Sequence, residues 1–261
     1  MSKSLKVSLI TVLAFGVYFF IDELFFRELR KSIFHGIGQM GVSHIIAYTI
    51  VGIPIFISVL ILHGRKNFFQ SLGLRSSLTK GFLFALLCTL PMFVGFAFVF
   101  EFNQDISLNT FLILMVAAAF FEELYFRSFL FGQLFRYTRL GFIPSVILGA
   151  LLFGAVHLYQ STDPGELIGI FLVTFLGGLL FSWVYTEWKY NLWAAVFLHL
   201  LMNFSWELFS VSDNAFGSLY ANIFRLITIA MIIVLTLLYK KRRGEKLMIN
   251  KQTIWKKPAA N

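Results

Sequence analysis

Long apolar runs constrain this chain more than any other feature of its sequence. Several stretches of about 20 residues are almost free of charge, among them 81–100 and 165–186. A helix of about 20 apolar residues crosses the ~30 Å hydrocarbon core of a bilayer. Such a helix also satisfies its own backbone hydrogen bonds where no water is present. The sequence therefore predicts an all-α, polytopic membrane protein.

The composition agrees with this prediction. Hydrophobic residues make up 58% of the 261 residues and charged residues only 13%, whereas the surface of a soluble domain of this size needs more polar groups. The one cysteine, Cys88, cannot form a disulfide within the chain, so cysteine usage does not indicate a redox compartment.

Eight membrane spans are predicted, roughly at 5–22, 43–63, 80–100, 109–132, 140–160, 165–186, 190–209 and 217–239. The first is interpreted as a retained helix, because no small-x-small cleavage site follows it. The segments 23–42 and 65–80 are expected to lie along the membrane surface. We divide the chain into three parts: the first three spans (1–107), a core of spans four to seven (108–210), and the last span with a basic tail (211–261).

The charges predict the orientation of these spans. With a cytoplasmic N-terminus, 17 of the 22 basic residues fall on the cytoplasmic side: Lys3, Lys6, Arg65, Lys66, Arg75, Lys80, Arg136, Arg139, Lys189 and the eight from Lys240 onward. Both termini are therefore expected in the cytoplasm. The net charge of +9 is concentrated near the membrane, so it indicates anionic lipid headgroups as partners and no nucleic acid.

A few strongly polar side chains lie deep in the predicted spans. Such groups are rare in lipid, face the protein interior and are functional candidates by default. They are Glu122, Glu123, Arg127, His157, His199 and Asn203, with Glu207 and Arg225 as weaker members.

Spacing assigns different roles to the two adjacent glutamates of "FFEELYFRSF" (120–129). Glu123 and Arg127 are four residues apart with the glutamate first, the favourable order for a helical ion pair, so a structural role is expected for both. Glu122 points about 100° away on an α-helix and has no such partner. An unpaired carboxylate in an apolar setting is expected to exchange protons near neutral pH.

The remaining polar groups are expected at the depth of Glu122. His199 and Asn203 are four residues apart and project from one helix face, and His157 closes the fifth span. A carboxylate, two imidazoles and a carboxamide together indicate activation of water: glutamate acts as the general base, one histidine relays the proton, and His199 with Asn203 stabilises an oxyanion.

Zinc is the alternative for this set, with Glu122, His157 and His199 as ligands and water in the fourth position. Glu123 is the one acid nearby that could orient a zinc-bound imidazole, and it is expected to be engaged by Arg127. We therefore favour a site without a metal or other cofactor.

Three motifs resemble those of a known family. "EELYFR" resembles an EExxxR motif, "FGAVH" (Phe153 to His157) an FxxxH motif, and "HLLMN" (His199 to Asn203) an HxxxN motif. In this order they are similar to the CAAX protease and bacteriocin-processing (CPBP) family of intramembrane endopeptidases, which includes type II CAAX prenyl proteases and the bacterial Abi proteins. The similarity covers about residues 108 to 210.

The resemblance implies eight helices around a conical cavity and hydrolysis of peptide bonds in membrane-associated or prenylated protein substrates. By this resemblance, Glu122 would activate water with His157, while His199 and Asn203 would stabilise the oxyanion. Glu123, Arg127 and Phe153 would support the site. The family was long classed with the metalloproteases, and a metal-free glutamate mechanism is now favoured for it. The resemblance also implies an integral protein of a bacterial plasma membrane.

The rival interpretation is a membrane protein without catalytic activity. It would be an immunity or scaffold protein, or a proton-coupled carrier in which Glu122 and the histidines form a relay.

Overall fold

Helices make up most of residues 2–256, the part of the chain that the computed structural model describes, and no strand lies in that range. The elements are α1 (Lys3–Ile37), α2 (Met40–Val51), α3 (Ile53–Ser71), α4 (Leu78–Val99), α5 (Leu108–Thr110), η1 (Phe111–Phe131), α6 (Gly132–Tyr137), α7 (Phe142–Val156), η2 (Leu158–Gln160), α8 (Pro164–Glu187), α9 (Leu192–Leu208) and α10 (Leu219–Arg242). The predicted all-α class is confirmed.

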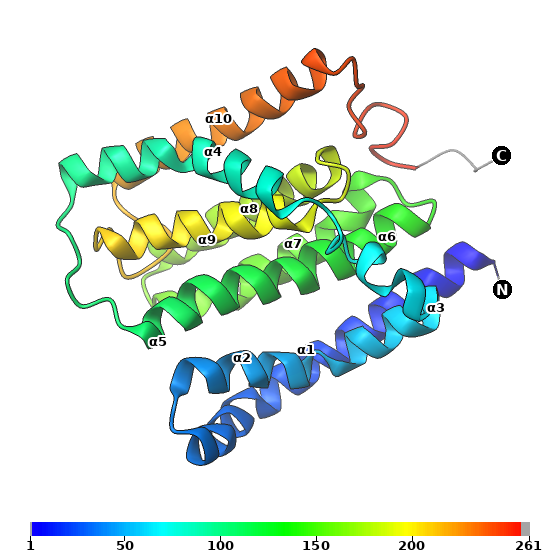
Figure 1. Cartoon of the computed structure of the whole chain (residues 1–261), viewed down its shortest axis with the longest axis horizontal. Helices are drawn as coiled ribbons and strands as arrows, with labels where there is room; N and C mark the ends of the chain where they lie inside the picture. Colours follow the sequence, from blue (N-terminus) through cyan, green and yellow to red (C-terminus); the bar gives the residue numbers. More distant parts are fainter. Residues whose placement is uncertain (1, 257–261) are drawn as a thin grey trace.

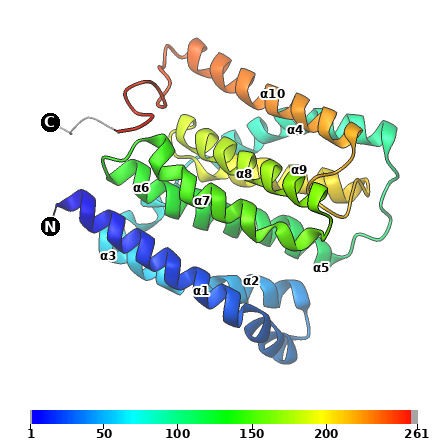
Figure 2. The same ribbon diagram turned by 180° about the vertical axis from the view of Figure 1, so that it is seen from behind.

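The helices form three groups, which Figures 1 and 2 show from opposite sides. One outer group contains α1, α2 and α3, and the other contains α4 and α10. Between them lie η1, α7, α8 and α9. Because η1 packs against α1, α2, α7, α8 and α9, every residue from Glu123 to Phe131 is buried.

Each predicted span coincides with a helix or with a pair of helices, but the count of eight is not confirmed. Six helices in residues 2–256 are long and apolar enough to cross a membrane, or seven if the bent pair α2 and α3 forms one span. The helix α9 is apolar but has only 17 residues, fewer than the about 20 that a perpendicular span needs.

The first helix is longer than predicted. Residues 23–37, expected as part of a separate surface segment, continue α1 without a break. The helix ends where Gly38 adopts a left-handed conformation (φ 73°) and its N–H bonds to Phe34 O. Residues 23–37 are compatible with a helix, so α1 continues past residue 22, where the sequence changes from apolar to charged.

The predicted span 43–63 is broken into α2 and α3, which are bent by 45°. The break lies at Gly52, two residues before Pro54, whose ring nitrogen cannot donate a helical hydrogen bond. The Tyr125 hydroxyl of η1 donates to Tyr48 O at 2.7 Å. A Cβ atom on Gly52 would lie 2.0 Å from that hydroxyl, so glycine permits the close approach of η1.

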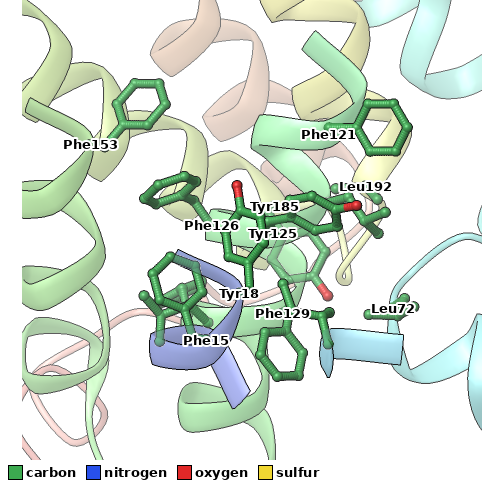
Figure 3. Packing of buried hydrophobic residues seen from close by; sticks show 14 of the residues in the cluster. Phe15, Tyr18, Leu72, Phe121, Tyr125, Phe126, Phe129, Phe153, Tyr185 and Leu192 are labelled. Atoms are coloured by element: carbon green, nitrogen blue, oxygen red, sulfur yellow. The ribbon is translucent and has the colours of Figure 1, made fainter. Parts of the chain in front are cut away.

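Aromatic side chains hold α1 against η1 (Figure 3). The rings of Phe15 and Phe126 are 5.2 Å apart, and those of Tyr18 and Tyr125 are 4.7 Å apart. Helix association in lipid relies on such packing because apolar side chains gain little by leaving the lipid. These two contacts fix the register of α1 along η1, and the two helices run in opposite directions.

The basic tail is folded against the protein as far as residue 256. The Glu187 carboxylate at the end of α8 forms a buried ion pair with Lys240 Nζ at 2.5 Å and accepts the N–H groups of Met248 and Ile249. Further along, carbonyl groups of residues 253–255 accept the first three N–H groups at the start of α7, those of residues 141–143. The tail therefore caps α7, a role that the basic composition did not predict.

Candidate functional site

The central helix η1 carries both glutamates and Arg127. It is a π-type helix, with backbone hydrogen bonds of the i→i+5 type, instead of the α-helix that the sequence predicted. Turns of this type are rare in proteins, and many of those known lie at functional sites. Glu123 and Arg127 of this helix contact His199 of α9 and Phe153 of α7, respectively.

The predicted ion pair between Glu123 and Arg127 is present. Arg127 Nε lies 3.3 Å from Glu123 Oε2, and both side chains are almost completely buried. The guanidinium carbon lies 3.9 Å from the centre of the Phe153 ring, close enough for a cation–π interaction. The charge of Arg127 is therefore neutralised by one carboxylate and stabilised by one aromatic face.

Glu123 has a second partner that the sequence did not predict. Its Oε1 accepts a hydrogen bond from His199 Nδ1 at 2.9 Å. Because an ionised carboxylate only accepts hydrogen bonds, the proton lies on Nδ1. The hydrogen bond to Glu123 therefore fixes the position of one ring proton of His199. The other ring nitrogen, Nε2, faces Glu122.

Glu122 is the free carboxylate of the site. Its Oε2 is buried and accepts no hydrogen bond from residues 2–256, and it lies 3.9 Å from His199 Nε2. That distance is too long for a hydrogen bond. The side chain is 20% exposed, whereas Glu123 is fully buried. The predicted difference between the two glutamates is thus present in their surroundings.

His157 is held by the motif that contains it. It lies just beyond the end of α7, where Nδ1 donates to Phe153 O at 2.6 Å, and its ring lies 4.5 Å from the Phe153 ring. Phe153 therefore contacts both Arg127 and His157. In the described part of the chain, no hydrogen bond or ion pair joins His157 to Glu122, so their predicted proximity is not a direct contact.

Asn203 is engaged with the central helix. Its Nδ2 donates to Leu114 O at 2.9 Å. Its side chain therefore ties α9 to η1, and the second N–H of the same Nδ2 remains as a donor.

Asp22 is a site residue that the sequence analysis missed. Because Phe15 meets Phe126 and Tyr18 meets Tyr125, the next turn of α1 brings Asp22 level with Glu122. The two carboxylates lie within range of each other's charge, and Asp22 Oδ1 is buried without a hydrogen-bond partner among residues 2–256. Asp22 lies four residues after Tyr18 and so on the same helix face, which is a pattern that could have indicated it. The predicted first span ends at residue 22, so Asp22 was not expected inside the membrane.

The three proposed zinc ligands are not assembled in the structure. Glu122 Oε2 and His199 Nε2 face each other, whereas His157 Nδ1 is bonded to a carbonyl. Within residues 2–256, no three His, Cys, Asp or Glu side chains have the arrangement of a metal site.

An apolar groove of about 750 Å³ opens between α2, α3 and η1. The wall contributed by η1 consists of Val116, Phe120, Phe121 and Leu124, on the turns that also carry Glu122. Opposite this wall lie side chains of α2 and α3, including Phe56, Leu60 and Phe68, with Arg65 as the one charged lining residue. The groove is large enough and apolar enough to hold a hydrocarbon chain beside the site.

The fold and site define a helical membrane protein with a carboxylate and imidazoles between its membrane-spanning helices. Residues 104–205 match the Rce1-like family model, described as type II CAAX prenyl endopeptidase Rce1-like. The match over this segment confirms the resemblance drawn from the three motifs. At the family level, it supports a CAAX-type intramembrane protease. No curated protein and no solved structure gives a significant match to the chain.

The matched range contains all seven residues singled out in the motifs, from Glu122 on η1 to Asn203 on α9. It excludes α1, which supplies Asp22, and it excludes α2 and α3, which supply one wall of the apolar groove. The family match therefore says nothing about Asp22 or about the groove wall formed by α2 and α3.

Proposed function

We propose that the chain is an intramembrane endopeptidase that hydrolyses peptide bonds of membrane-associated or prenylated CAAX-type proteins, with Glu122 as the base that activates water. The observation that carries the proposal is the contrast between the two glutamates. Glu123 is neutralised by Arg127 and bonded to His199, while Glu122 keeps a buried, unpartnered oxygen 3.9 Å from His199 Nε2.

The proposed reaction needs one carboxylate and one cationic donor. Glu122 takes a proton from water as the water oxygen attacks the scissile carbonyl carbon, with His157 sharing this proton. The tetrahedral oxyanion is stabilised by His199 Nε2–H and by the Asn203 Nδ2–H that Leu114 O does not accept. When the C–N bond breaks, the proton held by Glu122 moves to the leaving amine, which regenerates the carboxylate.

The role of His199 requires a doubly protonated ring. Its Nδ1–H already donates to Glu123, so donation to the oxyanion needs a second proton on Nε2. The Glu123 carboxylate stabilises that imidazolium, as a buried acid does in other catalytic triads. Glu123 therefore supports the structure through Arg127 and the chemistry through His199.

The test of the base is a Glu122→Gln variant, assayed with a fluorogenic membrane peptide. We expect turnover to fall by at least about 100-fold, since general base catalysis typically contributes that much. Glu101→Gln, which changes an exposed acid outside the core, is the matched control and should keep full activity. If Glu122→Gln cleaves as fast as the parent, the assignment is wrong. Ion or solute flux in vesicles without any cleavage would support the carrier instead.

The apolar groove supports a lipidated substrate. A tryptophan at position 60 would fill part of the groove, because Leu60 lines it. We expect Leu60→Trp to lower kcat/KM about tenfold for a farnesylated peptide, equivalent to 1.4 kcal/mol, and to spare the same peptide without the lipid. Leu87→Trp on α4 is the control, since Leu87 is equally apolar and exposed but does not line the groove. Equal losses for both peptides would place the lipid elsewhere.

A further inference from the structure

A second cavity, of about 530 Å³, lies at the end of the bundle where α4 and α9 begin. Three basic side chains line it: Arg75, Arg136 and Lys189. No acidic side chain of residues 2–256 is among its lining residues. A hollow with three positive charges and no lining carboxylate is suited to an anion.

Two tight turns form the walls of this cavity. Lys189 and Tyr190 both adopt left-handed backbone conformations (φ 58°), which non-glycine residues hold only where the surrounding structure imposes them. The facing turn contains Gly73, also with a positive φ of 72°. A Cβ atom on Gly73 would lie 2.2 Å from Tyr190 O, so the two turns touch through their backbones. The walls of the cavity are therefore two turns that pack directly against each other.

Arg136 is fixed in the cavity wall. Its Nη1 donates to Ser71 O at 2.6 Å and to the Tyr185 hydroxyl at 3.0 Å, and its Nη2 lies 3.4 Å from Gln70 O. The guanidinium carbon also lies 4.4 Å from the centre of the Tyr190 ring. A guanidinium has five donors, and these bonds use three. Two donors remain for a ligand on a side chain that is already oriented.

Two longer helices direct their positive ends toward the same place. The helix α4 begins at Leu78 and α9 at Leu192, each two residues after a lining residue of the cavity, Ser76 or Tyr190. Asn191 Nδ2 donates to Ser77 O at 3.0 Å and ties the two starts together. The field of both helix ends adds to that of the side chains.

One anionic group of the chain already approaches this cavity. Glu245 Oε1 lies 2.8 Å from Lys189 Nζ and 2.9 Å from Arg243 Nε. The Lys189 side chain in this pair is 64% exposed, and an exposed ion pair is weak enough to be exchanged for another anion.

We propose that this cavity binds a phosphate group, either the headgroup phosphate of an anionic membrane lipid or a free phosphate ester. A phosphate offers several oxygens to the two remaining donors of Arg136 and to the mobile charges of Arg75 and Lys189. Basic pockets between membrane helices near the cytoplasmic surface are suited to lipid headgroups. The site lies apart from Glu122 and does not depend on the proposed proteolysis.

The test compares two double variants of the full chain that remove the same amount of charge. Arg75→Gln/Lys189→Gln changes lining residues, and Lys80→Gln/Arg139→Gln changes exposed residues at the same end that do not line the cavity. Each protein is placed in phosphatidylcholine nanodiscs with and without phosphatidylglycerol, and its melting temperature and retained lipid are measured. A detergent series with inorganic phosphate, matched in ionic strength with chloride, tests the free anion.

We expect phosphatidylglycerol to stabilise the parent and the Lys80→Gln/Arg139→Gln control. The lining variant should lose the effect, with affinity lowered at least about tenfold. Stabilisation by inorganic phosphate as well would identify a free phosphate ester as a ligand, and stabilisation by the lipid alone would identify the headgroup. The proposal is overturned if the lining variant keeps the effect, if both double variants lose it equally, or if neither probe stabilises the parent.

Discussion

At the residue scale, Glu122 and Glu123 are neighbours in the sequence with different partners in the structure. Glu123 contacts Arg127 on its own helix and His199 on α9, so it links two helices. Glu122 has only a longer contact, in which its Oε2 lies 3.9 Å from His199 Nε2 without a hydrogen bond. A group that the fold does not need, placed where it is costly, is expected at a functional position.

This difference predicts opposite effects on stability. Arg127→Ala leaves Glu123 as a buried charge without its cation and should lower the free energy of unfolding by about 3–5 kcal/mol. Glu122→Gln keeps the shape and removes a carboxylate that is paired with no Lys or Arg side chain of residues 2–256, so the variant should be as stable as the parent or more stable, and inactive. Melting curves in detergent and cleavage assays on both variants measure this. A stable, inactive Arg127→Ala beside an unstable Glu122→Gln would reverse the two assignments.

The sequence predicted the local ion pair and the approach of His199 to Glu122, but it missed two other distant contacts. The Glu123–Arg127 pair follows from a spacing of four residues. The hydrogen bond between Glu123 and His199 joins residues that are 76 positions apart. Asp22 and Glu122 are 100 positions apart. Such contacts depend on which helices become neighbours, and periodicity within one helix carries no information about that.

At the element scale, the apolar runs predicted where helices form but not their shape. The bend between α2 and α3 depends on Tyr125 of η1 approaching Gly52, and the continuation of α1 to Ile37 depends on the absence of a helix breaker. The π-type turns of η1 have no signal in hydropathy. An apolar pattern is the same whether a helix face is buried in lipid or in protein. It therefore does not predict a bend, the end of a helix or π-type turns.

The folded tail predicts a stabilising role for one buried acid at the end of α8. Glu187 is paired with Lys240 and accepts two backbone N–H groups of the tail. Glu187→Ala should therefore lower the free energy of unfolding by about 3–5 kcal/mol. It should also expose the bonds after residue 244 to limited proteolysis, since the tail loses its main anchor. Melting temperature and protease digestion of the full chain measure both effects.

The matched control is Glu245→Ala, at a partly exposed position of the same segment, whose two ion pairs are with the exposed side chains of Lys189 and Arg243. It should leave melting temperature and digestion almost unchanged. If Glu187→Ala digests as slowly as this control, then the carbonyl groups that cap α7 hold the tail without the help of Glu187.

At the scale of the whole molecule, the start of α1 and the end of α10 lie at the same end of the bundle (Figure 1). The basic cavity is at this end too, since α4 and α9 begin beside it, and the connections after α4 and α7 are at the opposite end. Basic residues are retained on the cytoplasmic side of a membrane. We therefore infer that this end faces the cytoplasm, as the charge pattern predicted.

Cysteine labelling tests the orientation, because Cys88 is the only cysteine and is buried. In a Cys88→Ser background, Asp105→Cys places a thiol on the exposed connection after α4, and Lys251→Cys places one on the exposed surface of the tail. We expect a membrane-impermeant maleimide to label Asp105→Cys in intact cells and Lys251→Cys only after permeabilisation, since the charge pattern of the sequence predicts 17 of the 22 basic residues on the cytoplasmic side. The Cys88→Ser protein itself is the control for background labelling. The reverse pattern would place the basic cavity outside the cell and would contradict the orientation, while leaving the geometry around Glu122 unaffected.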